Sequence, residues 1–453
     1  MSMASKDRGL GNFFLSQHIK IGIIGTTNVG KTTLYNALVN ESSSARKALV
    51  ENSLFTTIEP NVGVVTIKDD RLKVLESLFN DIKRKEERLY NDDDNLEQID
   101  QHVYYKAVFK QATIIDTVGI VEGSRTDGGM GMHYLESIKD CDVILHVVRA
   151  FYDNDLTVSY EGDVNPIKEL DTVRQELMLS DLRIIEDNLM RIKIDLDDKN
   201  GGKKLLHEYV TLLNAYEILA GVARPEPEKG RKGRPAVQRF FPKTCKGKFL
   251  CCVKWDELEM RVLKSYRFYS NIEVIYMVNL TSRDYLRKIE EPADMARVKE
   301  TVGIDFPVLP FSANFEYDLS NVRNDEALEK YMSANPFHIS ALDRIYEEVF
   351  RRLKVIRYYT VNYDNNTKSG IVSSWTCIRQ TSVATAGSII TSDYDRLFLT
   401  AEVCDYMDLV KHKGDFAQLM KEGKFVNRGR KYVVNDGDIV YYKLKTALPI
   451  KKM

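Results

Sequence analysis

The stretch IGIIGTTNVGKTTLYNALVN, residues 21–40, contains residue types spaced as in a phosphate-binding loop. The pattern G-x-x-x-x-G-K-[ST] runs from Gly25 to Thr32. In such a loop the lysine reaches the β- and γ-phosphates of a nucleotide, and the hydroxyl that follows it holds Mg²⁺. We therefore expect Lys31 to bind phosphate and Thr32 to bind the metal. GTPases, ATPases, kinases and transporters all use this loop, so the motif leaves the nucleotide and the chemistry open.

Two further motifs follow in the order that a GTPase-type domain requires. The segment LFTTIEPNVGVVTI, residues 54–67, has a threonine pair before a proline and a strand, and a threonine there can close over the metal. The segment QATIIDTVGIVEG, residues 111–123, is an apolar strand that ends in Asp116, with Gly119 three residues later. We expect Asp116 to orient the Mg²⁺ ligands and the Gly119 N–H to sense the γ-phosphate. The glycine-rich residues that follow favour a switch loop.

One catalytic group of Ras-type GTPases is missing from this pattern. Those enzymes place a glutamine directly after D-x-x-G to orient the attacking water, whereas this chain has Ile120. Asn28 offers one substitute, because its side-chain carbonyl can help to bind a monovalent cation such as K⁺ beside the phosphates. His146, in the apolar strand CDVILHVVRAF, is a second candidate for catalysis, although a lone histidine in such a strand is more often a core residue.

The choice of base depends on a late strand, NIEVIYMVNLTSRDY, residues 271–285. GTPases have N-K-x-D here, and the aspartate accepts two hydrogen bonds from guanine. In this chain Leu280 replaces the lysine and Ser282 replaces the acceptor, so we do not expect a preference for GTP. Asn279 can address the adenine edge and Leu280 can cover its face. Within PFSANFE, residues 310–316, Ser312 and Ala313 are expected to present backbone N–H groups to the base.

A helical insert is predicted between these blocks. Apolar residues alternate in steps of four and three at Met178, Leu182, Ile185, Leu189, Ile192 and Leu196, and a shorter stripe follows at Trp255, Leu258, Val262, Tyr266 and Tyr269. The loop between them, 224–248, holds nine Lys/Arg and two Glu. We expect an antiparallel coiled-coil hairpin whose basic loop is either a phosphate-backbone contact or a solvated tip. Residues 80–106 form an acidic excursion to which no function is assigned.

These motifs together resemble the Obg-like ATPases, the YchF-type branch of the Obg translation-factor group, from about residue 19 to the C-terminus. The resemblance implies a Ras-like P-loop domain, an inserted helical hairpin and a C-terminal β-grasp TGS domain, with ATP hydrolysis and ribosome association. It implies Thr32 and Thr57 as Mg²⁺ ligands and a nucleotide loop formed by Asn28, Val29, Gly30, Lys31, Thr32 and Thr33. Phe151 matches a family position beside adenine, although ordinary core packing is equally expected. A hydrophobic residue after D-x-x-G is a family trait, whereas Ser282 stands where the family usually has glutamate.

The fold class expected is α/β. The expected domains are an extension over 1–18, a P-loop domain over 19–160 and 273–355, the helical insert over 161–272, and the TGS domain over 356–453. The strand-rich tail shows no catalytic pair, so it is expected to recognise RNA or protein, or to brace the P-loop domain.

The bulk composition fits a soluble, cytoplasmic protein, and we expect a monomer, although the sequence itself does not give the oligomeric state. The net charge is −1 over 453 residues, so we expect neither DNA nor membrane binding, and the N-terminus lacks the apolar centre of a secretory signal. The six cysteines are expected to be reduced thiols. Three functions stay open: a slow Mg²⁺-dependent ATPase that acts as a switch on the ribosome, a GTPase of similar use, and a nucleotide-stabilised adaptor without turnover.

Overall fold

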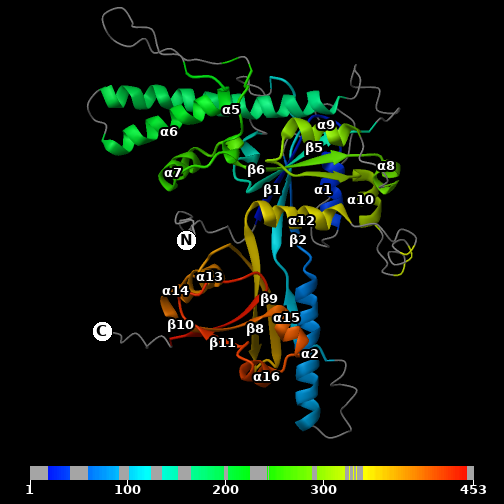
Figure 1. Cartoon of the computed structure of the whole chain (residues 1–453). Coiled ribbons are helices and arrows are strands. Elements are labelled where there is room, and N and C mark those ends of the chain that lie inside the picture. Colours follow the sequence, from blue (N-terminus) through cyan, green and yellow to red (C-terminus); the bar gives the residue numbers. More distant parts are fainter. Residues whose placement is uncertain are drawn as a thin grey trace, which may run out of the picture. The chain divides into compact units, whose positions relative to one another are not determined.

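The computed structural model describes residues 19–40, 60–90, 102–123, 135–151, 165–197, 202–224, 242, 244–287, 293–321, 326, 330, 333 and 340–445. The chain divides into two compact units (Figure 1). The first unit is formed mainly by Lys20–Val65 and Thr113–Val349. The C-terminal unit combines Thr66–Ala112 with Phe350–Met453. Each unit has its own sheet with helices packed on it, so the mixed α/β class is confirmed.

The first unit contains a six-stranded sheet in the order β2-β4-β1-β5-β6-β7 within the described residues. The strands are β1 (Ile19–Ile24), β2 (Asn61–Thr66), β4 (Gln111–Asp116), β5 (Val143–Arg149), β6 (Glu273–Asn279) and β7 (Val308–Phe311). The pairs β1–β5, β5–β6 and β6–β7 are parallel. Because β1, β5 and β6 are almost entirely buried, they are the continuous apolar runs that a parallel sheet covered on both faces requires.

Helices complete the first unit. They are α1 (Lys31–Asn40), α5 (Pro166–Asp197), α6 (Lys203–Ala220), α7 (Glu257–Tyr266), α8 (Ser282–Arg287), α9 (Ala293–Val302), α10 (Ala313–Ser320) and α12 (Ala341–Arg352). Helix α5 packs on both β5 and α9, and α1 packs on α10. The order strand, helix, strand places the carboxyl ends of β1, β5, β6 and β7 at one edge, where nucleotides bind in open α/β sheets.

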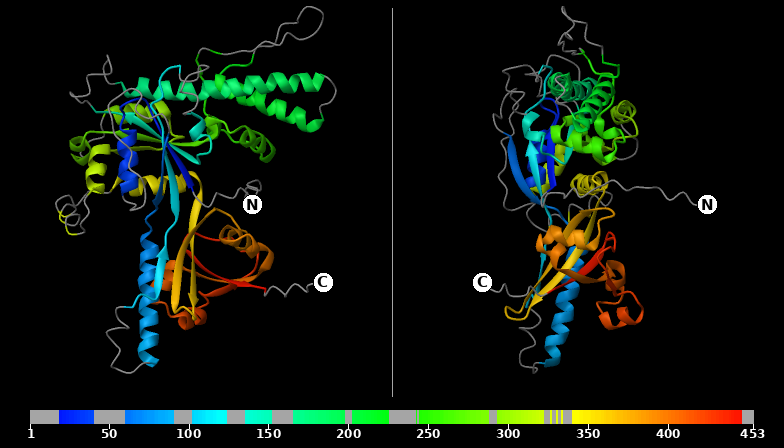
Figure 2. Two further views of the ribbon diagram at one scale, coloured as in Figure 1. Left: turned by 180° about the vertical axis from the view of Figure 1, so that it is seen from behind. Right: turned by 90° about the vertical axis from the view of Figure 1, so that its left-hand side faces the viewer.

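The helical insert differs in one respect from the sequence prediction. The apolar seam from Met178 to Ile192 is buried on α5 as expected, and Leu196 is half-buried. However, its main helical partner is α6, which runs back beside α5 (Figure 2), and α7 packs on α6. The predicted pairing of α5 with the 255–269 stripe across loop 224–248 is therefore wrong. Most of that loop, 225–241 and 243, lies outside the described residues.

Buried acids fix this insert to the rest of the first unit. Asp181 of α5 is fully buried and accepts hydrogen bonds from the Tyr269 N–H at 2.9 Å and the Ser270 N–H at 2.7 Å, just before β6. Burial raises the pKa of Asp181 to about 7. Glu186, also fully buried, receives two hydrogen bonds from Arg224 at 2.7 and 2.9 Å. The end of α6, where the basic loop begins, is thus tied to α5.

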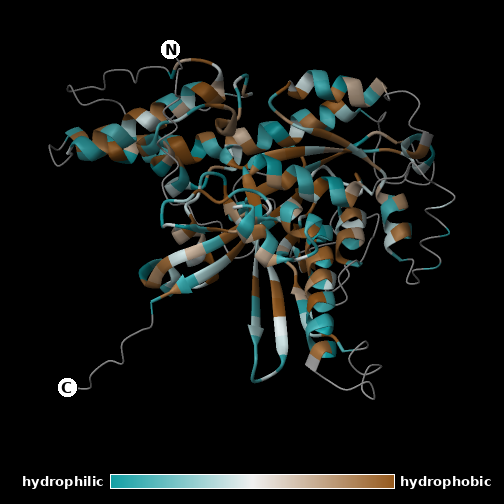
Figure 3. Cartoon of the chain, turned by 60° about the horizontal axis from the view of Figure 1, so that its bottom comes forward, coloured by the Kyte–Doolittle hydropathy of each residue, from teal (hydrophilic) through white to brown (hydrophobic). Residues whose placement is uncertain are grey.

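The C-terminal unit is built around a second six-stranded sheet, in the order β11-β10-β12-β8-β9-β3 within the described residues. Its strands are β3 (Tyr105–Val108), β8 (Val355–Asp364), β9 (Ser369–Ile378), β10 (Phe398–Asp405), β11 (Val426–Arg428) and β12 (Asp438–Leu444). Its helices are α2 (Asp70–Tyr90), α13 (Val383–Ile390), α14 (Asp393–Leu397), α15 (Tyr406–Lys411) and α16 (Phe416–Lys421). In Figure 3, α2 carries alternating brown and teal bands, as expected of a helix that covers a sheet with one face.

The segment 66–112 is an integral part of the C-terminal unit. Strand β3 pairs in parallel with β9, and apolar residues of α2 share a core cluster with β8, β9 and β12. The Asn80 side chain of α2 joins helix to strand, because its Oδ1 accepts from the N–H groups of Tyr104 and Tyr105 at 2.8 and 2.9 Å. The expected assignment of all of 19–160 to the P-loop domain therefore needs correction, and the excursion over 80–106 belongs largely to this unit.

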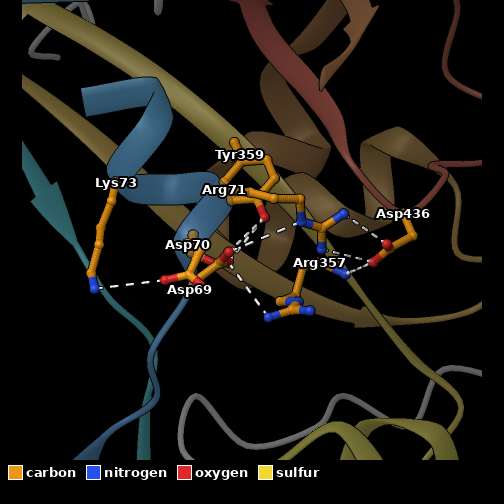
Figure 4. Close-up of polar contacts among 8 residues, drawn as sticks. Asp69, Asp70, Arg71, Lys73, Arg357, Tyr359 and Asp436 are labelled. Carbon is orange, nitrogen blue, oxygen red and sulfur yellow. Dashed lines mark hydrogen bonds and ion pairs between the residues drawn. The ribbon is translucent and has the colours of Figure 1, made fainter. Parts of the chain in front are cut away.

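A charge network around the buried Asp69 anchors the start of this segment (Figure 4). Asp69, which is 4% exposed, accepts from the Tyr359 hydroxyl at 2.9 Å and lies 3.8 Å from the Arg357 guanidinium. Arg71 pairs with Asp436 at 2.8 Å, and the Arg357 N–H donates to the same carboxylate at 2.8 Å. Acids and arginines from distant parts of the chain therefore neutralise one another inside the C-terminal unit.

Candidate nucleotide site

The phosphate-binding loop turns from β1 into α1 with two residues in left-handed backbone conformations. Asn28 has φ 58° and Gly30 has φ 97°. A Cβ at residue 30 would lie 2.3 Å from the Asn279 amide nitrogen, so both the conformation and the space require glycine there. Val29 is fully buried and Thr33 is half-buried, so packing against the protein interior holds the loop in place. A turn of this kind directs successive N–H groups to one point, as a phosphate cradle does.

Lys31 begins α1 and is 6% exposed. Its ammonium donates to the Thr26 carbonyl at 2.5 Å, inside the loop. Burial lowers the pKa of Lys31 to about 8, although the nearby Asp116 and Glu169 carboxylates act in the opposite direction. A buried ammonium with so little solvent around it is suited to an anionic ligand, which would supply the charge that water no longer provides.

The predicted metal ligands Thr32 and Asp116 are brought together. The Thr32 hydroxyl donates to one Asp116 oxygen at 2.9 Å, and the Asn61 amide donates to the same oxygen at 3.2 Å. The other oxygen of Asp116 is buried and has no hydrogen-bond partner among the described residues. Burial raises the pKa of Asp116, and Lys31 limits that rise. A carboxylate and a hydroxyl beside the phosphate loop are the oxygen donors that Mg²⁺ prefers, so the residues present fit this metal. Thr57 lies outside the described residues.

The D-x-x-G segment lies directly against the phosphate loop. A Cβ on Gly119 would lie 2.8 Å from the Thr27 N, which leaves room only for glycine. The Ile120 N–H donates to the Gly25 carbonyl at 2.9 Å, and the Ile120 side chain is 4% exposed. The Thr27 hydroxyl is buried and without a hydrogen-bond partner among the described residues. The D-x-x-G segment thus packs against the phosphate loop, with an apolar residue at the position of the Ras glutamine.

His146 is a core residue of the sheet. It is 2% exposed, lies between Ile24 and Tyr276 in the strand registers, and has its ring 5.1 Å from the Tyr276 ring. Burial lowers the pKa of His146 to about 3, with Arg174 and Lys31 adding to the effect. The imidazole is therefore neutral near pH 7 and is enclosed by the neighbouring strands of the sheet. This burial favours the core-packing alternative, and a direct catalytic role for His146 stays a prediction.

Asn279 joins the phosphate loop to the loop after β7. Its amide donates to the Val29 carbonyl at 2.9 Å, and its side-chain oxygen accepts from the Ala313 N–H at 2.9 Å. Both ends of the amide are therefore used by the protein. Asn279 was expected to address the adenine edge, but the geometry makes it first a brace between the two loops that surround the nucleotide.

The other residues expected to contact the base follow the carboxyl ends of β5, β6 and β7. Phe151 is half-buried one residue after Ala150, whose N–H donates to the Asn279 carbonyl at 2.9 Å. Leu280 is 5% exposed and donates its N–H to the Phe311 carbonyl at 2.8 Å. Ser312 is 1% exposed and precedes α10. The sheet therefore collects these predicted residues at one edge, beside the phosphate loop.

Several residues of this region carried no signal in the sequence. Asn61 reaches Asp116 from the first residue of β2, and Arg149 pairs with Glu169 of α5 at 3.1 Å. Glu176, 1% exposed, accepts from the Gly123 N–H at 2.8 Å, four residues after Gly119. Each contact joins segments distant in sequence, and a search for local motifs cannot find such contacts.

Comparisons with family models support both units of the chain. Residues 20–182 match a family described as 50S ribosome-binding GTPase. Residues 355–445 match the C-terminal domain model of YchF-type GTPases, which is described as a protein of unknown function. Among the described residues, no helix is both long and apolar enough to cross a membrane.

Similar proteins extend this agreement over nearly the whole chain. Obg-like ATPase 1 of Homo sapiens is 30% identical over 449 residues, covering 98% of this chain and 96% of the relative. Obg-like ATPase 1 of Caenorhabditis elegans is 28% identical, with coverage of 96% and 94%. The structure of the Schizosaccharomyces pombe YchF GTPase is similar in fold, with a TM-score of 0.68, 24% identity and coverage of 95% of this chain and 99% of that one.

Proposed function

The chain belongs to the Obg-like ATPases, the YchF-type family of P-loop NTPases, and from this premise we propose that it binds Mg²⁺–ATP and slowly hydrolyses it to ADP and phosphate. We further propose that this cycle is a nucleotide-dependent switch associated with the ribosome. A cytoplasmic location and a monomeric state are part of the same proposal.

The observation that carries the proposal is the buried group of charges at the end of β1. Lys31, 6% exposed, is hydrogen-bonded to a backbone carbonyl, and Asp116, 1% exposed, has one oxygen without a partner among the described residues. Such an arrangement is costly unless a ligand completes it. A triphosphate would neutralise the ammonium, while Thr32 and Asp116 would hold Mg²⁺, which supplies charge neutralisation at the phosphates when bound.

Slow turnover follows from the groups beside this site. Ile120 is buried and apolar, so it cannot orient the attacking water, and the lowered pKa of the buried His146 makes its imidazole a weak base. The proposal therefore relies on positioning of the phosphates by the loop and on the Gly119 N–H. Electrostatic stabilisation of this kind supplies much of the catalysis in phosphoryl transfer.

The test is turnover of ATP and of GTP by the purified chain with Mg²⁺. We expect phosphate release above the rate of free ATP, and we expect Lys31→Ala to abolish tight triphosphate binding. Lys73→Ala is a matched control, because it makes the same change at an exposed lysine of α2, in the C-terminal unit. A rate indistinguishable from free ATP, with intact binding, would support a nucleotide-stabilised adaptor instead.

Asn28 is proposed to substitute for part of the missing catalytic group through K⁺. Its left-handed φ of 58° is one that asparagine tolerates, and it lies in the loop that would surround the phosphates. We expect faster ATP turnover in K⁺ than in Na⁺ at equal ionic strength, so that screening is constant. Asn28→Gly, which accepts the same φ, should remove that difference and leave binding through Lys31 intact. Equal rates in the two salts for the unmodified chain would exclude this use of Asn28.

Ribosome association is proposed to use the basic loop and the C-terminal unit. The packing of α5 on α6 supports the coiled-coil hairpin of the family, and the strand-rich C-terminal unit supports its TGS domain. The basic loop starts at Arg224, held by Glu186, and ends near Cys245, whose backbone exchanges two hydrogen bonds of 2.7 Å with the Gln175 amide. Both ends are therefore fixed on α5, which suits a presented binding loop.

Neutralising Arg231, Lys232 and Arg234 together should weaken binding to ribosomes or RNA. These residues lie outside the described part of the chain, so the expectation comes from their charge. The slope of log affinity against log salt should fall by about two to three units, because each lost phosphate contact removes about 0.7 to 0.9. A matched control neutralises the exposed Lys73, Lys85 and Arg88 of α2. An unchanged slope in the first variant would make the loop a solvated tip.

GTP is the second candidate substrate, because residues 20–182 match a family described as 50S ribosome-binding GTPase. Leu280 and Ser282, which depart from the guanine motif, argue against a preference for GTP. Measuring ATP turnover and GTP turnover in the same assay distinguishes the two candidate substrates.

A further inference from the structure

Two serine hydroxyls meet where the base of a nucleotide would be read. Ser282 follows β6 and Ser312 follows β7, and their hydroxyl oxygens are 3.3 Å apart. We propose that this pair contacts the purine without a fixed donor or acceptor. The site then binds adenine and guanine nucleotides with affinities within about tenfold of each other, a difference in binding free energy of about 1.4 kcal/mol. The inference rests on the proposed function, because it assumes that the site binds a nucleotide.

The position of the pair follows from the sheet. The carboxyl ends of β5, β6 and β7 lie at one edge, since these strands are parallel and adjacent. Asn279, at the end of β6, bonds to both the phosphate loop and the Ala313 N–H. A nucleotide whose phosphates lie on the loop therefore extends its base toward the residues that follow β6 and β7.

The two hydroxyls are available to a ligand. Ser312 is 1% exposed and precedes α10, but its side chain makes no capping bond to that helix. Ser282 is half-buried at the start of α8. Among the described residues, each hydroxyl has a hydrogen bond to the other alone, and either can be the donor. A hydroxyl both donates and accepts, and it rotates to suit its partner.

The backbones that carry the hydroxyls are held rigidly. The Leu280 N–H donates to the Phe311 carbonyl at 2.8 Å, which joins the two segments. Behind them, the Tyr285 hydroxyl donates to the fully buried Glu316 at 3.1 Å, and Glu316 also accepts from the Ala341 N–H at 2.8 Å. The oxygens are therefore fixed in place while their hydrogens turn, so adaptation to either base needs no loop movement.

Guanine and adenine differ in what they offer to such a pair. Guanine presents an N1–H and an amino group, which are donors, whereas adenine presents N1 as an acceptor beside its amino group. A carboxylate accepts only and so selects guanine donors, as it does in N-K-x-D motifs. A hydroxyl pair accepts from one base and donates to the other, and the guanine donor left over can reach water beside the half-buried Ser282. The hydroxyl pair therefore discriminates little between adenine and guanine.

The test compares the dissociation constants of ADP and GDP, measured by titration calorimetry with Mg²⁺, so that hydrolysis does not intervene. The unmodified chain is expected to bind both within about tenfold. Ser282→Asp introduces a fixed acceptor and should move the ratio toward GDP by at least tenfold. Ser282→Asn has nearly the same shape as aspartate but offers both a donor and an acceptor, so its ratio should stay near that of the unmodified chain.

Two results would overturn the inference while leaving the proposed ATPase standing: a preference for ADP well beyond tenfold in the unmodified chain, or a Ser282→Asp ratio that does not move. A shift of equal size in Ser282→Asn would also overturn it, because shape and not polarity would then decide. Failure of the unmodified chain to bind either nucleotide would overturn the proposed function and the inference with it. Circular dichroism of each variant confirms that it is folded.

Discussion

Lys31 is the residue on which the proposed phosphate site depends, and its environment makes it sensitive to pH. With its ammonium buried in the loop, the charged form has lost most of its hydration, and its pKa is lowered to about 8. A bound phosphate favours the charged form, because an anion close to an ammonium raises its pKa. Nucleotide binding is therefore coupled to the protonation of this side chain.

The sign of the resulting pH dependence is fixed. Below about pH 8 the free protein already carries the charged lysine, so affinity for nucleotide should be nearly constant. Above it, binding must first protonate Lys31, so the affinity should fall by up to about tenfold for each further pH unit, until the pKa of the bound form is reached. Titration calorimetry with ADP between about pH 7 and pH 9.5 measures this.

Lys31→Arg is the control for that measurement, because a guanidinium stays charged over this range. In the arginine variant the affinity is expected to be weaker and its decline above pH 8 to disappear. The same decline in both variants would assign the effect to another group and remove Lys31 from the explanation.

Much of this site was predictable at the residue scale, because phosphate chemistry restricts residue types tightly. The loop Gly25–Thr32, Asp116 and Gly119 lie together as their spacing indicates. The role of His146 could not be decided from the sequence, since a histidine in an apolar run gives the same pattern whether it faces a ligand or a tyrosine ring. The use of the Asn279 amide by Val29 and Ala313 could not be predicted either, because it depends on loops that meet only in the folded chain.

At the scale of elements, α5 connects the nucleotide site to the helical insert. Adjacent residues on this helix hold two distant segments: Glu176 accepts from the Gly123 N–H, and Gln175 holds the backbone of Cys245. Gly123 closes the described part of the D-x-x-G segment, and Cys245 lies near the end of the basic loop. A rigid helix thus carries both the segment that would sense a γ-phosphate and one end of the loop that would bind the ribosome.

Removing the Glu176 carboxylate should impair turnover more than binding. Glu176→Ala removes the hydrogen bond that the half-buried Gly123 N–H donates to this carboxylate, and a hydrogen bond to a charged group contributes about 1.5–3 kcal/mol. The D-x-x-G segment then loses its fixed position, so we expect kcat for ATP to fall several-fold while ADP affinity, which needs no γ-phosphate contact, is retained. Steady-state kinetics and ADP titration measure the two effects.

Glu176→Gln separates this positioning role from a purely structural one, since its amide oxygen can still accept from Gly123. We expect the glutamine variant to recover most of the turnover. Gln175→Ala, which changes only the Cys245 contact, should leave kcat close to that of the unmodified chain. An equal loss of kcat and ADP affinity in Glu176→Ala would instead indicate general unfolding of the site.

The helical insert shows what hydrophobic periodicity can and cannot predict about a helix. Burial of Leu182, Ile185 and Leu189 on one face of α5 follows from their spacing. The sequence pattern pointed to the wrong partner for α5, namely the apolar stripe at 255–269. The actual partner, α6, has an equally apolar face with Leu212, Tyr216 and Leu219. Periodicity predicts that a helix buries a face, but it does not say against which element.

For the molecule as a whole, the least predictable feature is that the C-terminal unit is built from two parts of the sequence. The family model for this region covers residues 355–445, yet β3 and α2 complete its sheet and its core from residues 66–112. The acidic composition of the excursion gave no indication of this, because strand pairing over some 265 residues depends on tertiary structure alone. Asp69 begins the segment in a buried position against Tyr359.

This two-part construction predicts that contacts between the parts set the stability of the C-terminal unit. Tyr359→Phe removes the hydroxyl that donates to the buried Asp69 at 2.9 Å, and a hydrogen bond to a charged group contributes about 1.5–3 kcal/mol. Tyr358→Phe is the matched control, because it is the adjacent residue, is equally buried, and loses hydrogen bonds to neutral groups alone, the Ala386 carbonyl at 2.8 Å and the Tyr442 hydroxyl. Its expected cost is about 0.5–1.5 kcal/mol.

Native-state hydrogen exchange of the full chain measures this difference unit by unit, which a single melting temperature of a two-unit protein does not. In Tyr359→Phe the slowest amides of β8, β9 and β3 should lose protection together, because opening the Asp69 contact releases the segment 66–112 from the sheet. In Tyr358→Phe the loss should be smaller and should include α13, where Ala386 lies. Equal losses in both variants, or protection of β3 that does not follow that of β9, would mean that the segment is attached to the sheet without stabilising it.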